Sequence, residues 1–254
     1  MIHTKRHSWY RAAAGALAFV ASTPAFAQNT PPRGVSYGLE LAFSSGHADR
    51  GFLISDRPVV QPVSWVGWNG AAFSVWSSVP LTPNTDGTRP HIMELELGRE
   101  HHWGKFTIEP AARMYFYHEA LSRESDRSLE GWLFLSYDVG PFSLFTNQSL
   151  DVQTYPGAYF VDAGIESERH VSSPLDIGAR LGAGFASARF NDAYAGVPQP
   201  ALDRIRTDAW LTVSAKRLYI SPRVEYSTII DPAVRAAVPQ PSYVLFRLTL
   251  GGEF

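Results

Sequence analysis

The sequence predicts an all-β protein, a closed antiparallel transmembrane β-barrel of about 12 strands that follows a cleaved signal peptide. Three observations support this fold class. Apolar and polar residues alternate in segments of about ten residues, short turns and long polar loops connect these segments in turn, and the chain ends on the aromatic Phe254. Because a tilted strand of about ten residues crosses a hydrocarbon core of ~30 Å, this segment length is typical of outer-membrane barrels.

The composition excludes several other classes of protein. The 254 residues are 45% hydrophobic and 13% aromatic, which is too apolar for a disordered chain. Cysteine is absent, so disulfide scaffolds, thiol nucleophiles and cysteine-ligated metals are excluded. The formal net charge of −2 predicts no attraction to nucleic acid.

Residues 1–27 have the pattern of a secretory signal peptide. A basic stretch over 5–11 precedes an apolar stretch over 12–21, and Ala25-Phe26-Ala27 supplies the small residues of a cleavage site. The apolar stretch is well short of the roughly 20 residues that a membrane-spanning helix needs. We therefore expect an exported mature chain, residues 28–254, that forms the barrel in the outer membrane of a Gram-negative cell.

Two-residue alternation identifies the strands in order along the mature chain. In the first of them, Val35, Tyr37 and Leu39 face one side while Gly38 and Glu40 face the other. The predicted strands are 35–43, 58–68, 71–81, 93–97, 106–116, 128–139, 142–151, 159–166, 175–185, 209–216, 218–226 and 244–250.

The connections differ between the two ends of the predicted barrel. The short turns are Asn69-Gly70, 101–104, Gly140-Pro141, 169–174 and the region around Arg217. The long polar loops are 44–57, 82–90, 118–127, 152–157, 187–207 and 231–242. A soluble β-sandwich also alternates, but it rarely keeps such long strands and such one-sided loops through twelve strands.

The last predicted strand resembles the signal that the barrel-assembly machinery recognises in outer-membrane proteins. Apolar residues occupy every second position before the terminal aromatic residue. We expect this signal to comprise Phe246, Leu248, Leu250 and Phe254, and we expect the assembly machinery, outer-membrane lipid and lipopolysaccharide to be partners of the chain.

The first hairpins resemble those of the TorF-type porins. The shared features are Arg50-Gly51 after the first strand, the Pro–apolar–Gln segment 58–61, and an aromatic third strand over 72–78 that ends in Trp-Ser-Ser. The resemblance covers residues 34–80 and the C-terminal Phe. It implies a small outer-membrane barrel that passes small solutes, and it implies no catalytic residue. An oligosaccharide-specific porin of similar size is the alternative family.

Charged side chains on the strands are expected to face the lumen, since an Arg or Lys at the bilayer midplane costs roughly 2–4 kcal/mol on the lipid side. Ten acidic and six basic residues belong to this inward series, Lys105 and Lys216 among them. We expect Arg247 to neighbour Glu40 and Arg113 to face Glu94 or Glu96. The residues predicted to line a pore are Glu40, Glu94, Glu96, Glu109, Arg113, Glu130, Asp162, Arg180, Arg223, Glu225 and Arg247.

Two functions fit this interior. The charges select solutes in a narrow channel for passive passage of small hydrophilic solutes, or they pair with one another and leave a non-conducting structural or surface-interaction barrel. A lipid-modifying enzyme is a third alternative, and its only His-x-Ser motif, His170-Val171-Ser172, lies in a predicted turn. His101-His102 has no third metal ligand at useful spacing. We therefore predict a channel with no enzymatic activity, no cofactor and no metal.

The terminal strand provides a test of the assembly signal. Deletion of Phe254 removes the aromatic residue that ends the alternating strand, so we expect slower insertion and longer exposure to periplasmic proteases. The measurement is the amount of folded, heat-modifiable protein in the outer membrane. Normal outer-membrane levels of the truncated chain would contradict the proposed signal.

Overall fold

The computed structural model describes residues 34–118 and 126–254, so the predicted signal peptide and most of the predicted loop 118–127 lie outside the described residues. No helix in these two ranges is long and apolar enough to cross a membrane.

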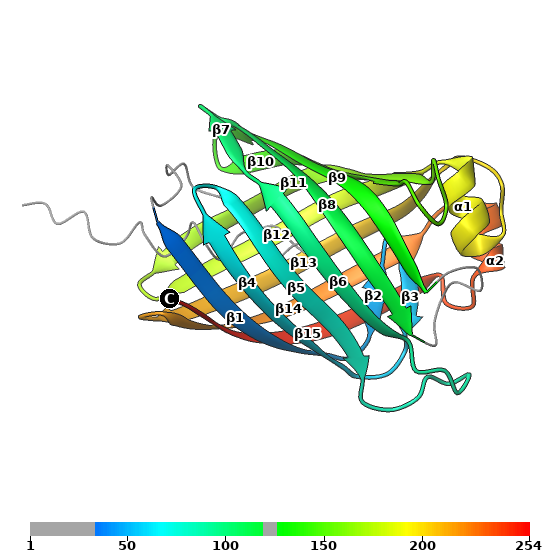
Figure 1. The fold of residues 1–254 in the computed structure, drawn as a ribbon, viewed down its shortest axis with the longest axis horizontal. Coiled ribbons are helices and arrows are strands. Elements are labelled where there is room, and N and C mark those ends of the chain that lie inside the picture. Colours follow the sequence, from blue (N-terminus) through cyan, green and yellow to red (C-terminus); the bar gives the residue numbers. More distant parts are fainter. Residues whose placement is uncertain (1–33, 119–125) are drawn as a thin grey trace, which may run out of the picture.

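Twelve long antiparallel strands form a single tilted barrel (Figure 1). Most of them lie within two or three residues of the predicted boundaries. The strands are β1 (Val35–Ser44), β4 (Val59–Trp68), β5 (Ala71–Pro80), β6 (His91–Arg99), β8 (Phe106–His118), β9 (Arg127–Val139), β10 (Phe142–Asp151), β11 (Tyr159–Ser172), β12 (Leu175–Ala186), β13 (Ala201–Ala215), β14 (Leu218–Ile229) and β15 (Ser242–Glu253).

The ladder closes on itself, so the barrel wall has no free edge. Each strand pairs with its neighbours in sequence, β6 pairs with β8, and the first strand β1 pairs with the last strand β15. At the seam, Phe254 donates its N–H to the Tyr37 carbonyl at 2.8 Å, and Tyr37 donates back at 3.1 Å. Closure gives every strand a partner on both sides, so the backbone N–H and C=O groups are hydrogen-bonded within the wall. Lipid offers these groups no other hydrogen-bond partner.

The outer face of the wall is an apolar belt, as the alternation predicts. In β1, Val35, Tyr37, Leu39, Leu41 and Phe43 are 37–69% exposed, while the residues between them are less exposed. Phe246, Leu248, Leu250 and Phe254 belong to the same outer face, and the Phe254 ring stacks on Tyr37 with centroids 5.7 Å apart. Their part in assembly stays a prediction.

Glycines on the inner face receive aromatic rings from the neighbouring strand. Gly178 on β12 lies opposite Trp210 on β13, and a Cβ at Gly178 would overlap the Trp210 ring. Gly38 on β1 lies opposite Trp65 on β4, and a Cβ there would overlap the Trp65 ring in the same way. The absence of a side chain at these glycines lets a large ring lie flat against the wall.

The long loops contain structure that the alternation did not predict. The first holds a hairpin, β2 (His47–Asp49) and β3 (Phe52–Ser55), which forms a separate two-stranded sheet. Helix α1 (Ala188–Ala195) follows β12, and helix α2 (Pro232–Ala237) follows β14. Ser187 and Asp231 cap these helices by accepting N–H bonds from their first turns, and Gly196 ends α1 with φ 67°.

The largest apolar core lies inside the loop end of the barrel. Apolar residues of the hairpin and of both helices pack there against rings and aliphatic side chains of the wall (Figure 1). The buried members are Phe52, Ile54, Val63, Trp65, Trp76, Ile92, Tyr115, Ala158, Phe160, Ala186, Phe190, Ile229 and Val234. The loops therefore fill part of the lumen.

Three predicted boundaries are wrong. β13 begins at Ala201, so the predicted loop 187–207 is shorter by seven residues. β11 continues to Ser172, so the 169–174 region is mainly strand and turns only at its end. The predicted turn 101–104 contains a short strand, β7 (His101–Trp103), which continues the pairing of β6 along β8. In each case the cross-strand partner extends the ladder beyond the sequence pattern.

The glycine–aromatic contacts predict an asymmetry between two strand glycines. Gly178→Ala should destabilise the barrel by about 1–3 kcal/mol, because the new methyl group must displace the Trp210 ring. Gly131→Ala is the matched control, since a methyl group at Gly131 would project into open space on the outer face, with no other atom within 4 Å. The measurement is the temperature at which the compact form is lost in detergent. Equal loss of stability in both variants would contradict the packing role of Gly178.

Candidate functional site

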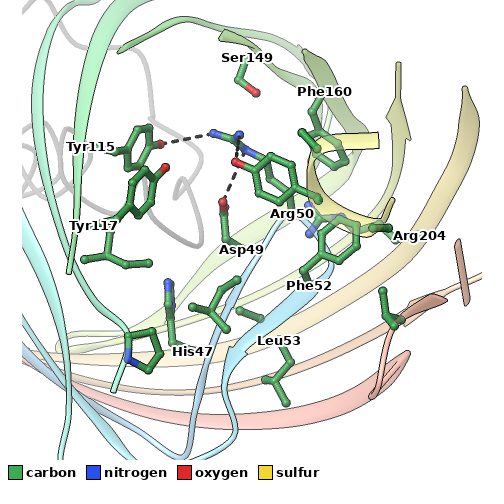
Figure 2. Close-up of a pocket in the computed structure, with 18 of the residues that line it drawn as sticks. His47, Asp49, Arg50, Phe52, Leu53, Tyr115, Tyr117, Ser149, Phe160 and Arg204 are labelled. Carbon is green, nitrogen blue, oxygen red and sulfur yellow. Dashed lines mark hydrogen bonds and ion pairs between the residues drawn. The ribbon is translucent and has the colours of Figure 1, made fainter. Parts of the chain in front are cut away.

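A cavity of about 750 Å³ occupies the loop-end half of the lumen. The hairpin forms one side, the inner face of β5–β14 forms the wall, and loop residues such as Asn84 and Gln240 form the mouth. Figure 2 shows Asp49 and Arg50 at the middle of this opening, with Tyr115 and Tyr117 on one side and Phe160 on the other.

Arg113 on β8 illustrates how the wall holds its charges. Its Nε donates to Glu96, its register partner on β6, and lies 3.7 Å from Glu94 Oε1. Its guanidinium carbon lies 3.7 Å from the centroid of the Trp132 ring on β9. The expectation that Arg113 faces Glu94 or Glu96 is confirmed, and the guanidinium contacts both. A carboxylate and an aromatic face together stabilise the cation where little water reaches it.

The same arrangement recurs on the opposite wall. Arg180 on β12 donates from Nε to Glu166 Oε2 on β11 at 2.8 Å, and it lies 4.6 Å from the Phe145 ring centroid. On β13, the Nη2 atom of Arg204 lies 3.2 Å from Asp162 Oδ2 on β11. Removing one member of such a buried pair typically costs about 3–5 kcal/mol, because the other charge stays buried without its partner.

A longer network joins β13 and β14. Arg206 Nη2 lies 2.8 Å from Asp208 Oδ1 and 3.1 Å from Glu225 Oε2. Arg223 Nη1 lies 3.9 Å from the same Asp208 oxygen, and its guanidinium carbon lies 4.5 Å from the Trp210 ring centroid. Asp208 therefore balances two cations on adjacent strands.

Arg50 comes from the hairpin tip rather than from the wall. Its Nη1 donates to Glu130 Oε1 on β9 at 2.8 Å, and its Nη2 pairs with the second oxygen of the same carboxylate. The tyrosine hydroxyls of Tyr194 on α1 and Tyr115 on β8 lie 3.4 Å and 3.5 Å from the guanidinium nitrogens. This bidentate pair joins the first loop to the wall across the lumen.

The side chains predicted to line a pore all face inward and are buried or half-buried. Five of them line the cavity, namely Glu94, Arg113, Asp162, Arg180 and Glu225. The other six lie outside this cavity, namely Glu40, Glu96, Glu109, Glu130, Arg223 and Arg247. Their role in conduction stays a prediction.

Two expectations about the lumen charges are wrong. Arg247 lies opposite Ser44 in the closed register, while Glu40 lies opposite Gly251 and accepts a hydrogen bond from the Tyr219 hydroxyl. The closing strands are thus paired four residues away from the register that would join Arg247 to Glu40.

Lys105 and Lys216 are exposed at the short turns instead of projecting into the lumen. Lys216 adopts φ 59° there, which a turn position requires. The prediction extended the strand alternation into the turn residues, and it therefore assigned both lysine side chains to the lumen.

Among the charged lumen residues that the sequence pattern missed, four belong to the ion-pair networks described above. Arg204, Arg206 and Asp208 lie on the first half of β13, outside the predicted strand 209–216, although they alternate in phase with it. The register shift between Gly184 and Phe185 of the partner strand lies just before Arg204. It separates the outward residues Leu202 and Ile205 by three positions, so the two-residue period does not extend to the start of β13. The fourth, Arg50, lies in a loop, where alternation gives no signal.

His47 at the base of the hairpin is fully enclosed. Its Nδ1 lies 3.2 Å from the Gln61 amide nitrogen, and its ring centroid lies 5.4 Å from that of Trp76. Burial lowers the pKa of His47 to about 4. The positive charge of Arg247 also lowers this pKa, whereas the negative charge of Asp49 raises it. The imidazole is therefore neutral at pH 7 and accepts the Gln61 N–H.

Residues that suggested enzymatic or metal chemistry do not assemble into such a site. His170 lies at the exposed end of β11, where its Nδ1 is 2.9 Å from Asp176 Oδ1. His102 lies beside another short turn, where its ring nitrogens are 2.6 Å from Glu100 Oε1 and 3.0 Å from Thr107 Oγ1. Within 34–118 and 126–254, no group of three or more His, Asp or Glu side chains could hold a metal ion.

Comparison with known proteins supports the fold. No family model matches the chain. No curated protein matches it either.

Three solved structures superpose over most of both chains. A KdgM porin is 11% identical, covers 86% of this chain and 99% of its own, and gives a TM-score of 0.51. A NanC porin is 13% identical, with 85% and 98% covered and a TM-score of 0.53. An outer membrane channel from Pseudomonas putida F1 is 7% identical, with 88% and 96% covered and a TM-score of 0.51. At these identities, the likeness is one of fold.

The buried imidazole predicts that the hairpin loosens in acid. The folded hairpin binds the His47 proton more weakly than the unfolded chain, whose His pKa is about 6.5. Stability is therefore full above pH 6.5, decreases as the pH falls toward 4, and levels off after a loss on the order of 3 kcal/mol. Hydrogen exchange of the amides of residues 47–55 measures this opening.

His47→Gln is the matched control, because an amide can accept the same bond without titrating. The ratio of wild-type to variant exchange rates should increase between pH 7 and pH 4.5. A constant ratio would show that protonation of His47 does not open the hairpin.

Proposed function

We propose that the chain is a channel of the Gram-negative outer membrane that allows passive passage of small hydrophilic solutes. The observation that carries this proposal is the charged interior of a closed barrel with an apolar outer belt. Twelve strands enclose more space than the eight whose interior side chains can fill. The cavity of about 750 Å³ is space of this kind, and it is lined by charged and polar groups that solutes can contact.

The cavity charges favour cations. Seven acidic and five basic side chains line it, so the fixed charge is modestly negative. The acidic members are Asp49, Asp56, Asp86, Glu94, Asp151, Asp162 and Glu225, and the basic members are Arg50, Arg113, Arg180, Arg204 and Arg206. A lumen with this excess attracts cations and repels anions of similar size.

The relation to known families supports the same class of function. The KdgM and NanC proteins to which the fold is similar are porins by name. The Arg50-Gly51 motif and the segments over 58–61 and 72–78 resemble TorF-type porins, and we propose that the chain is a divergent member of that family. As a barrel of this kind, it would contact lipid and lipopolysaccharide and be inserted by the assembly machinery.

A non-conducting structural barrel is the second candidate. The observation in its favour is the apolar core that the hairpin, α1 and α2 build inside the loop end of the lumen. Electrical recording separates the two candidates, because a barrel without a water path carries no ions.

Planar-bilayer recording of the refolded mature chain tests the channel. We expect conductance with a modest cation preference, which weakens as the Debye length decreases from about 10 Å at 0.1 M salt to about 3 Å at 1 M. Asp49→Asn should reduce this preference, since Asp49 lines the cavity. Asp192→Asn, on the exposed side of α1, is the matched control and should leave it unchanged.

Reversal potentials under a salt gradient provide the measurement. An anion-selective wild type would contradict the charge count of the cavity. A bilayer that stays silent at every salt concentration would favour the structural barrel.

A further inference from the structure

The β2–β3 hairpin lies in the lumen without joining the barrel ladder. It forms its own two-stranded sheet, and the described backbone bonds to the wall come from its two ends, at Ser45 and Pro58. Between these ends, the hydrogen bonds to the rest of the protein involve side chains, as in the pair His47–Gln61. The hairpin can therefore move without breaking a strand pair of the barrel.

The hairpin crosses the lumen rather than following the wall. It leaves β1 and returns into β4, while its tip residue Arg50 pairs with Glu130 on β9. In the closed strand order, β9 lies five strands from β1 in one direction and seven in the other, so the two are nearly diametrically opposed. Figure 2 shows Arg50 at the centre of the opening, consistent with a bar across it.

The conformation of Arg50 indicates that its side chain matters at this position. Its φ is 48°, in the left-handed region, where a residue other than Gly costs roughly 1–2 kcal/mol. Gly51 beside it has φ 95° and forms the other half of the turn. A second glycine would relieve the strain, so the arginine is explained by what its guanidinium binds. Strained positions of this kind concentrate at functional sites.

The contacts of the tip concentrate on one carboxylate. Arg50 binds both oxygens of Glu130, and its guanidinium carbon also lies 6.0 Å and 5.8 Å from the ring centroids of Tyr115 and Phe190. Beside it, Phe52 packs on the rings of Phe190 and Tyr194 of α1. Phe190 and Tyr194 of α1 therefore contact both Phe52 and the Arg50 guanidinium, so the apolar contacts and the ion pair hold the tip at one place.

We propose that the β2–β3 hairpin is a lid over the lumen and that Arg50–Glu130 is its latch. This inference rests on the proposed channel function and adds its regulation. With the latch closed, the bar narrows the passage between the mouth and the deeper charged wall. With the latch open, the tip swings toward its anchored ends and the full width of the lumen is available to solutes.

The test combines a probe of lid motion with a probe of conduction. The chain has no native cysteine, so a nitroxide label at Leu53→Cys, on the cavity side of the hairpin, reports lid mobility alone. We expect an immobile label in the otherwise wild-type chain. Arg50→Glu sets two carboxylates against each other, and it should favour the open lid on the order of 100-fold, with a mobile label and increased conductance.

Three further variants define the latch. The exchange Arg50→Glu with Glu130→Arg restores the opposite charges and should restore both the immobile label and the low conductance. Arg50→Gly suits the turn but removes the guanidinium, so it should also free the lid. Arg57→Glu is the matched control in the same loop, because its side chain is 47% exposed and pairs with Asp56 rather than with Glu130.

The two readouts separate failure of the lid from failure of the channel. A label that stays immobile in Arg50→Glu would overturn the latch, whatever the conductance. An immobile label in Arg50→Gly would show that the turn alone seats the tip and would also overturn it. A mobile label with unchanged, measurable conductance would overturn the lid while leaving the channel function intact. A mobile label in a silent barrel would refute both.

Discussion

The permanent positive charge of the lumen arginines is the constraint on which the rest of this structure depends. A guanidinium keeps its charge at every relevant pH, and the lipid face cannot accept it. These arginines therefore face inward, where a neighbouring strand supplies a carboxylate, as Glu96 does for Arg113 and Glu166 for Arg180. A slip of one residue between these strands would separate both partners and turn apolar side chains into the lumen, so the ion pairs and the apolar belt specify one register.

This constraint explains how much of the fold the sequence could predict. Alternation depends on one face meeting lipid and the other meeting the lumen, so it identified the twelve strands and the inward side of residues such as Glu94. It failed on the first half of β13, because the period breaks just before Arg204 and the strand begins eight residues ahead of its predicted start, so Arg204 and Arg206 were missed. It failed at the turns, where Lys105 leaves the strand geometry. The Arg247–Glu40 pairing depended on the closing register, which the pattern of two separate strands does not contain.

The sequence pattern could not predict which loop segments fold into the lumen. Whether a polar loop folds inward depends on space and on partners supplied by strands far away in the chain. The loop containing Arg50 reads as an ordinary connection until Glu130, Tyr115 and Tyr194 are brought to the same place by barrel closure. Ser187 caps α1, but the apolar surface that holds this helix exists only inside the assembled barrel.

The chemistry of the hairpin follows from its position in a lumen that holds both apolar and charged surface. An apolar tip would bury its whole contact area against the wall and stay there, because exposing apolar surface to water is unfavourable. A guanidinium has an alternative, since water can solvate it once it leaves Glu130. Because the Arg50–Glu130 pair is buried, the cost of taking both charges out of water offsets much of the strength of its individual bonds. An arginine at the tip gives the closed position a defined geometry and still allows the tip to leave it, which a fixed apolar plug would not.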